Sequence, residues 1–392
     1  MTGQQLRVMT VVGTRPEVIR LSRVLSRFDE SFDHVLVHTG QSYDYALNQV
    51  FFDELELRAP DHYLGVDTST LGHVLGGTLS GVEQVLLEVR PDALLVLGDT
   101  NSCIAALMAK RLQVPVYHME AGNRCFDANV PEEVNRKMVD HIADFNLVYT
   151  EHARRNLLAE GIGSRWIALT GSPMGEVLAY YSEAIEQSGA LSRLQVEAGQ
   201  YFVVSAHREE NVDDARRLAS LVEVLTEVYR AYELPLLVST HPRTRKRLDA
   251  LGVASLEGVT FHEPFGFLDY VKLQKNAYCV LSDSGTISEE SSILGFPAVT
   301  LRDSTERPEA VEAGAIIATG VNAPVVLNGI DLTVVQHSSG SRASLPPGYE
   351  ILDCSQRVVN FIRSTAAVAY QWAGVRRRSP IWASEGAELL LD

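Results

Sequence analysis

The stretch from Tyr278 to Gly320 constrains the fold more than any other part of this sequence. Its short apolar runs, polar loops and helix-like periodicity predict the order strand, loop, helix, strand, loop, helix, strand. The apolar run Tyr278–Leu281 precedes a polar loop, and the helical pattern Thr286–Leu294 stops at a glycine. The next strand is expected at Ala298–Leu301. Each helix is therefore expected to begin at the carboxyl end of a strand.

Such helix N-termini are suited to holding an anion, because their free N–H groups and the positive end of the helix dipole face the crevice. Ser284 and Gly285 precede the first helix, which begins at Thr286, and Arg307 precedes Pro308 at the second. A cation at a helix N-terminus is unfavourable unless a negative group lies nearby. The sequence therefore indicates phosphate binding at this stretch.

Glu290 extends this interpretation to a nucleotide. It lies one turn beyond Thr286, where its carboxylate could accept hydrogen bonds from the vicinal hydroxyls of a ribose. The alternative is a pair of ordinary strand–helix connections, with Ser284 as an N-cap and Glu309 complementing a dipole. The arginine at position 307 favours the nucleotide site.

The same pattern recurs along the whole chain. Val8–Val12 is followed by Gly13 and Thr14, and then by Arg15 and Pro16 in the places that Arg307 and Pro308 occupy later. About six strands per half and alternating helices predict two doubly wound α/β domains with parallel sheets, hinged near 171–200. Polar clusters at the strand ends suggest one interdomain site. The other expected strands are 34–38, 94–97, 114–117, 146–149, 166–169, 201–205, 235–239 and 259–261.

Charge and composition exclude several classes of protein. A net charge of −16 over 392 residues argues against a nucleic-acid partner. No apolar run approaches the roughly 20 residues needed to span a bilayer, and the first apolar segment is too short for a signal peptide, so a cytoplasmic protein without a membrane partner is expected. Four widely spaced cysteines argue against a structural metal. The sequence contains no G-x-G-x-x-G after the first strand and no Walker A motif, so no nicotinamide or ATP cofactor is expected.

Four side chains at predicted strand or loop ends could transfer protons. These candidates are Asp99, Glu120, Glu132 and His207. An unpaired carboxylate after five apolar residues is costly unless it has a function or caps a helix, and both alternatives stay open for Asp99. Glu132 could simply complement a helix dipole, and His207 could be a structural, hydrogen-bonded residue or a phosphate ligand.

Glu120 follows His118 with one residue between them. A His-x-Glu pair could bind a metal, but no third ligand stands at helical spacing, so a structural His118 is the stronger alternative. His241 is interpreted as structural or supporting, and the run Arg376-Arg377-Arg378 as a solvated turn.

Together these residues resemble the motif set of the non-hydrolysing UDP-N-acetylglucosamine 2-epimerases. Each motif alone is weak, but they occur in the family's order between residues 13 and 310. The matching motifs are Gly13-Thr14-Arg15-Pro16-Glu17, Thr39-Gly40-Gln41, Gly98-Asp99-Thr100, His118-Met119-Glu120-Ala121-Gly122, Pro131-Glu132-Glu133-x-Asn135-Arg136, His207-Arg208-Glu209-Glu210-Asn211, Asp283-Ser284-Gly285 and Glu306-Arg307-Pro308-Glu309-Ala310.

The resemblance implies the GT-B architecture, with two Rossmann-like domains at 1–172 and 173–364, an active site between them and a C-terminal helix, about 365–392, that returns to the first domain. It also implies a homodimer and a reaction without a cofactor. UDP leaves carbon 1 of a UDP-N-acetylhexosamine, a 2-acetamidoglycal forms, and UDP adds back after protonation on the other face. Similarity gives acid–base roles to Asp99, Glu120, Glu132 and His207, UDP binding to Arg15, His207, Ser284, Gly285, Thr286, Glu290 and Arg307, and sugar-site support to Asn123 and Arg136.

Departures from the usual motifs point to one branch of the family. The family's Asp-Ser-Gly-Gly is here Asp283-Ser284-Gly285-Thr286, and Ser42-Tyr43-Asp44 replaces a common histidine, which puts an allosteric second nucleotide-sugar site in doubt. With the segment 123–127, this version resembles enzymes that convert UDP-2-acetamido-2,6-dideoxy-L-talose to UDP-N-acetyl-L-fucosamine for surface polysaccharide or lipopolysaccharide. The alternatives are UDP-N-acetylglucosamine as substrate, a GT-B glycosyltransferase, or a nucleotide-sugar sensor.

Overall fold

The computed structural model describes residues 5–40, 51–240, 242–253, 255–340 and 343–375. The chain divides into two compact units, here called unit 1 (1–123, 131–177 and 351–392) and unit 2 (124–130 and 178–350). The division expected from the sequence lies at 172 and 364, without a separate assignment of 124–130. His241, Gln41, Ser42-Tyr43-Asp44 and the run at 376–378 lie outside the described residues.

Unit 1 contains a seven-stranded parallel sheet in the order β3-β2-β1-β4-β5-β6-β7. Six of these strands match the expected ones to within a few residues. The strand β3 was not predicted, because a two-residue edge strand leaves no periodic pattern. The strands are β1 (Arg7–Val12), β2 (Asp33–His38), β3 (His62–Tyr63), β4 (Ala93–Leu97), β5 (Val116–Met119), β6 (Phe145–Val148) and β7 (Ile167–Leu169).

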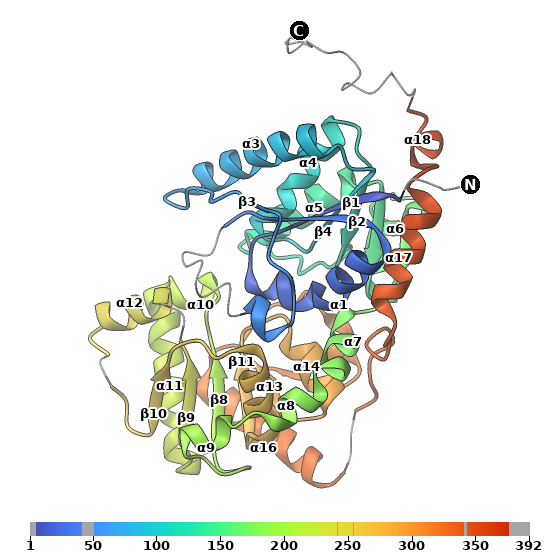
Figure 1. Ribbon diagram of the computed structural model, residues 1–392. Helices are drawn as coiled ribbons and strands as arrows, with labels where there is room; N and C mark the ends of the chain where they lie inside the picture. The colour runs from blue at the N-terminus through green and yellow to red at the C-terminus, as the bar shows by residue number, and fades with distance from the viewer. Residues whose placement is uncertain (1–4, 41–50, 241, 254, 341–342, 376–392) are drawn as a thin grey trace. The chain divides into compact units, whose positions relative to one another are not determined.

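Helices cover both faces of this sheet, and alternate strand residues supply each core. On one face Met9, Val11 and Val96 pack in a buried cluster that includes residues of α3, α4 and α5. On the other, α17 packs against α1, as the red and dark blue helices of Figure 1 show. The helices are α1 (Arg15–Ser31), α3 (Leu71–Val89), η1 (Asn101–Ile104), α4 (Ala105–Arg111), α5 (Glu132–Ile142), α6 (Glu151–Ala159), η2 (Ser164–Trp166), α7 (Pro173–Tyr180), α17 (Cys354–Thr365) and α18 (Ala369–Trp372).

The chain returns to unit 1 through α17. Arg363 of α17 donates a hydrogen bond to the carbonyl oxygen of Ser31 at the end of α1, 2.8 Å away. The sequence predicts a helical tail over 355–372, and α17 and α18 confirm it. The bounds of about 365–392, implied by the family resemblance, lie mostly outside the described residues. The pattern of α17 is amphipathic, with Val358, Val359 and Ile362 buried.

Unit 2 contains a six-stranded parallel sheet in the order β10-β9-β8-β11-β12-β13. One core includes Phe202, Val204 and Leu281 with α11 and α16, and the other includes Tyr201, Val203 and Val280. The strands are β8 (Phe202–Ser205), β9 (Leu236–Ser239), β10 (Val259–His262), β11 (Cys279–Ser282), β12 (Ala298–Thr300) and β13 (Ile317–Ala318). The helices are α8 (Ser182–Gln187), α9 (Ala190–Leu194), α10 (Glu209–Val212), α11 (Ala215–Tyr232), α12 (Pro242–Ala250), α13 (Phe267–Asn276), α14 (Ile287–Leu294), α15 (Pro308–Glu312) and α16 (Ala323–Ser338).

The predicted pair of doubly wound parallel sheets is confirmed. In each sheet the chain winds outward in one direction and then reverses, between β1 and β4 in unit 1 and between β8 and β11 in unit 2. Such a reversal opens a crevice beyond the carboxyl ends of the two strands, where α/β proteins bind ligands. Within the described part of the chain, no helix has the length and hydropathy to cross a membrane.

Candidate functional site

Asp99 follows β4 and is held by the face of α5. Arg136, which is buried, donates from Nε to Asp99 Oδ2 over 3.1 Å and forms a second bond to the same oxygen through Nη2. Asn135 donates to the Asp99 carbonyl oxygen, 3.0 Å away. The N-cap of the following helix η1 is Thr100, so the alternative of Asp99 as a cap is wrong. An arginine beside a carboxylate favours the ionised form, which can accept a proton.

Glu120 directly follows the neighbouring strand β5 and has a left-handed backbone conformation, with φ of 65°. Arg20 of α1 forms an ion pair with its Oε2, and Asn123 Nδ2 lies 3.5 Å from its Oε1. All three side chains are buried. Non-glycine residues with positive φ are costly and cluster at functional sites, which fits a carboxylate turned into the crevice.

His118 does not form a metal site with Glu120. Its Nδ1 lies 2.8 Å from Asp140 Oδ1, and its Nε2 lies 2.7 Å from the Gly98 carbonyl oxygen. Both ring nitrogens are therefore occupied, and the structural alternative for this histidine is confirmed.

The other unit 1 candidates lie at helix N-termini. Glu132 is the first residue of α5 and is half-buried. Arg15 is the first residue of α1, and its guanidinium lies over the Phe51 ring, 4.8 Å from the centroid. A helix start is predicted from sequence at both places, with Arg15 one residue before the helix instead of its first residue.

In unit 2, buried Asp283 organises the loops after β8 and β11. It accepts hydrogen bonds from the backbone N–H groups of His207 and Arg208, both at 3.0 Å from Oδ2, and from Asn211 Nδ2 at 3.0 Å. The His207 ring is about half exposed, and its Nδ1 lies 3.6 Å from Asp283 Oδ1. Asp283 therefore fixes the backbone of His207, while about half of the imidazole surface remains exposed.

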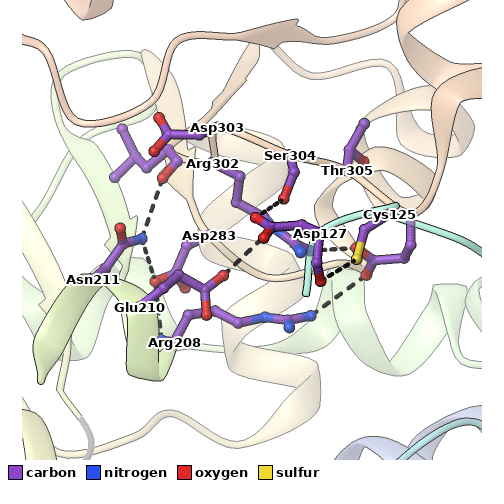
Figure 2. A network of polar contacts seen from close by, with 12 residues as sticks. Cys125, Asp127, Arg208, Glu210, Asn211, Asp283, Arg302, Asp303, Ser304 and Thr305 are labelled. Carbon is purple, nitrogen blue, oxygen red and sulfur yellow. Dashed lines mark hydrogen bonds and ion pairs between the residues drawn. The ribbon is translucent and has the colours of Figure 1, made fainter. Parts of the chain in front are cut away.

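A network of arginines and carboxylates adjoins this loop, and Figure 2 shows Arg208 and Arg302 in it together with Asp127, Glu210 and Asp283. Arg208 Nη2 lies 3.4 Å from Glu306 Oε1, and Arg302 Nη1 lies 2.6 Å from Glu306 Oε2. Ser304 donates to Asp127 Oδ2 over 3.3 Å. Two arginines therefore share one glutamate, and this glutamate fixes the positions of both.

The loop Ser284-Gly285-Thr286 leads into α14 and packs tightly on this network. A Cβ atom added at Gly285 would clash with Glu306 Oε1. The N-cap of α14 is Thr286 and not Ser284, whose hydroxyl lies 2.9 Å from that of Thr286. Buried Glu290, one turn on, accepts a hydrogen bond from Gln274, 2.7 Å away.

Arg307 has a partner that the sequence analysis did not foresee. Its Nη1 lies 2.7 Å from Glu289 Oε2, and both side chains are buried. Glu289 thus supplies the negative charge beside Arg307 that was expected to come from a bound ligand. Glu309, in the first turn of α15, accepts from Tyr349 OH at 2.9 Å, and burial raises the pKa of its carboxyl.

Comparison with known proteins assigns this arrangement to a family. A family model described as UDP-N-acetylglucosamine 2-epimerase matches residues 26–363. The chain belongs to this family. A solved UDP-N-acetylglucosamine 2-epimerase from Rickettsia bellii is 43% identical, with a TM-score of 0.88, and the match covers 95% of this chain and 100% of that one.

Two further relatives show the range of the family. A Methanocaldococcus jannaschii UDP-GlcNAc 2-epimerase, solved in complex with UDP-GlcNAc and UDP, is 35% identical with a TM-score of 0.86 and covers 92% of this chain and 100% of its own. A Pseudomonas aeruginosa relative, UDP-2,3-diacetamido-2,3-dideoxy-D-glucuronate 2-epimerase, is 36% identical over 321 residues, 80% of this chain and 88% of its own. The protein is thus an isomerase with the GT-B architecture.

One charged group of this epimerase was missed from sequence, and a second has more contacts than its position in the sequence indicates. Arg20 gave no local signal. Glu17 lies in the first turn of α1, as its place after Pro16 predicts, and it is fully buried. Its Oε2 accepts from the Gly13 and Thr14 N–H groups at 2.9 and 2.7 Å, and its Oε1 accepts from Ser102 Oγ. Burial raises the pKa of Glu17, although these hydrogen bonds lower it. A glutamate on the apolar face of α1 was the available signal.

Proposed function

We propose that this epimerase inverts carbon 2 of a UDP-N-acetylhexosamine by elimination and re-addition of UDP. The observation that carries the proposal is the pair of arginine-bound carboxylates, Asp99 and Glu120, at the ends of the adjacent strands β4 and β5. An inversion needs one proton acceptor and one proton donor, acting on opposite faces of the same carbon. Glu132, at the start of α5, is the third acid–base candidate.

The chemistry begins with departure of UDP. The C1–O bond breaks with its electron pair going to the diphosphate, and the cationic character at C1 acidifies the C2 proton. A carboxylate takes that proton, and the C1=C2 double bond of a 2-acetamidoglycal forms. A second acid then protonates C2 from the opposite face, and UDP attacks C1 again. Atoms and electrons balance without an oxidant or reductant.

Unit 2 supplies most of the groups proposed for UDP, and Arg15 of unit 1 supplies one. The exposed ring of His207 and the loop Ser284-Gly285-Thr286 would contact the diphosphate, because free N–H groups and cations stabilise the charge of a leaving phosphate. Arg15 and Arg307 would add positive charge, and Glu290 would bind the ribose. Asn123 and Arg136, which contact Glu120 and Asp99, would support the sugar site.

For the sugar itself we propose UDP-2-acetamido-2,6-dideoxy-L-talose, with UDP-N-acetyl-L-fucosamine as product, for surface polysaccharide synthesis. The support is the sequence of the two segments 123–127 and 283–290. The Pseudomonas aeruginosa relative is named for a different UDP-sugar from the other two proteins, so membership of this family leaves the sugar open. UDP-N-acetylglucosamine is the second candidate, favoured by the names of those two.

Proton NMR in deuterium oxide tests both levels of the proposal. Deuterium should enter C2 of the 6-deoxy-L-talo substrate and not C2 of UDP-N-acetylglucosamine. Exchange in UDP-N-acetylglucosamine alone would support the proposed reaction and show that the proposed sugar substrate is wrong. Tight UDP binding without exchange in either substrate would favour a glycosyltransferase or a nucleotide-sugar sensor. The homodimer implied by family resemblance is tested separately by sedimentation equilibrium.

A further inference from the structure

We propose that His118 and Asp140 are positioning residues that hold the loops carrying Asp99 and Glu120 in one fixed arrangement. The inference rests on the proposed function, because it gives these two carboxylates their roles. Neither positioning residue is placed to touch the reacting atoms. Both side chains are fully buried in unit 1, beneath the ends of β4 and β5.

The pair binds one backbone group from each loop. His118 Nε2 lies 2.7 Å from the carbonyl oxygen of Gly98, the residue before Asp99. Asp140 Oδ2 accepts the N–H of Gly122, two residues after Glu120, at 3.1 Å. The two side chains also contact each other, with 2.8 Å between His118 Nδ1 and Asp140 Oδ1. A continuous hydrogen-bonded path therefore joins the two catalytic loops.

The bound loops have backbone conformations that need support. Positive φ angles occur at Gly98 (68°), Glu120 (65°) and Gly122 (81°). A glutamate in this region is strained by about 1–3 kcal/mol and keeps the conformation only when its surroundings impose it. The Asp140 carboxylate and the His118 ring supply such surroundings on the side of the sheet that α5 covers.

The donors and acceptors determine how the pair is protonated. A carbonyl oxygen only accepts, so His118 Nε2 must carry a hydrogen. An ionised carboxylate also only accepts, so one further proton must lie between His118 Nδ1 and Asp140 Oδ1. The total charge of the pair is the same whichever of the two atoms holds that proton. Without the proton, the hydrogen bond between His118 and Asp140 is lost. Asparagine at position 140 could donate its N–H to Nδ1 and accept from Gly122, which would preserve the path without that proton.

The same strand provides a matched control. Tyr117 precedes His118 and its side chain points to the opposite face of the sheet, where its buried hydroxyl lies 2.8 Å from Thr365 Oγ1 of α17. Tyr117→Phe therefore removes a buried hydrogen bond from the same strand without touching either catalytic loop. It separates a loss of stability from a loss of loop geometry.

The experiment compares His118→Phe, Asp140→Asn and Tyr117→Phe in the full-length protein. For each we would measure kcat of C2 deuterium exchange, the Kd of UDP by calorimetry and the Tm. His118→Phe should lower kcat about 100-fold, because a small misplacement of a catalytic group has an effect of this size. UDP affinity should persist, since its proposed ligands lie mostly in unit 2. Tyr117→Phe should lower Tm and keep kcat, and Asp140→Asn should keep most of kcat.

If His118→Phe keeps kcat at the level of Tyr117→Phe, the positioning role is wrong. If His118→Phe does not fold, Asp140→Ala replaces it, because it removes the acceptor for Gly122 while His118 can still bind Gly98; normal kcat in that variant would also overturn the inference. Absence of exchange in the wild-type protein would count against the proposed function instead.

Discussion

Arg307 and Glu289 form a buried ion pair, with 2.7 Å between Nη1 and Oε2. The pair places a carboxylate beside an arginine that caps the N-terminus of α15. Both charges are removed from water, so each depends on the other. Family similarity nevertheless gives Arg307 the role of binding the diphosphate of UDP. The stability of the protein and its affinity for UDP should therefore be linked.

Glu289→Gln should destabilise the free protein more than the UDP-bound protein. Loss of one partner from a buried ion pair costs about 3–5 kcal/mol. A bound diphosphate would return a negative charge to Arg307 and offset part of that loss. Urea unfolding with and without saturating UDP measures both values, with the exposed pair Glu227–Arg230 as control through Glu227→Gln. If UDP stabilises wild type and Glu289→Gln equally, Arg307 does not bind the phosphates.

Glu120→Gln should reduce turnover about 100- to 10,000-fold, the range for loss of a general acid or base. The amide keeps the size of the side chain, so UDP affinity should hold. Exchange kinetics and calorimetry measure the two effects. Glu151→Gln, at an exposed residue of the same unit, is the control. Equal losses of turnover and UDP binding in Glu120→Gln would contradict a role in proton transfer.

Gly285→Ala should weaken UDP binding at least about tenfold, because the methyl group displaces Glu306 and with it the two arginines that Glu306 holds. Gly76 in α3 has open space around its Cβ position, so Gly76→Ala serves as the control and should bind UDP normally. Calorimetric titration with UDP gives the affinities. Unchanged binding in Gly285→Ala would place the diphosphate elsewhere.

The stability of the protein should rise between pH 4 and pH 6.5 because of His38. Burial lowers the pKa of this histidine to about 4, from 6.5. Between these values the unfolded chain binds the proton and the folded protein does not, so the free energy of unfolding increases with pH. The contribution is at most about 3 kcal/mol.

His38→Gln should remove that component of the pH dependence. Denaturant unfolding at a series of pH values measures it, and the exposed His337 offers the control His337→Gln. A His38→Gln curve parallel to that of the wild type would show that His38 has no such lowered pKa.

The sequence predicted the strands and their polar ends well, because buried parallel strands are continuous apolar runs that end abruptly. It predicted the electrostatics of single residues less well. Asp99 and Arg136 are 37 positions apart, and Arg20 and Glu120 are 100 apart, so no local pattern connects them. Only the fold brings them together.

The bounds of single helices are harder to predict than the helical regions that contain them. The sequence indicates helical segments from 176 to about 194, and α7, α8 and α9 occupy this region. Short turns around Tyr181 and Gly189 separate the three helices without a strong sequence signal. Asp140 could have been suspected from sequence. It lies four residues after Arg136 on the buried face of α5, where an acidic residue requires a partner.

The assignment of 124–130 to unit 2 and of 351–392 to unit 1 means that neither unit is a continuous piece of chain. Synthesis on the ribosome produces α1 before unit 2 and produces α17, which packs against α1, after it. Unit 1 can therefore complete its packing only after all of unit 2 has been synthesised. Truncation before Cys354 would remove α17 and leave α1 without the helix that packs against it.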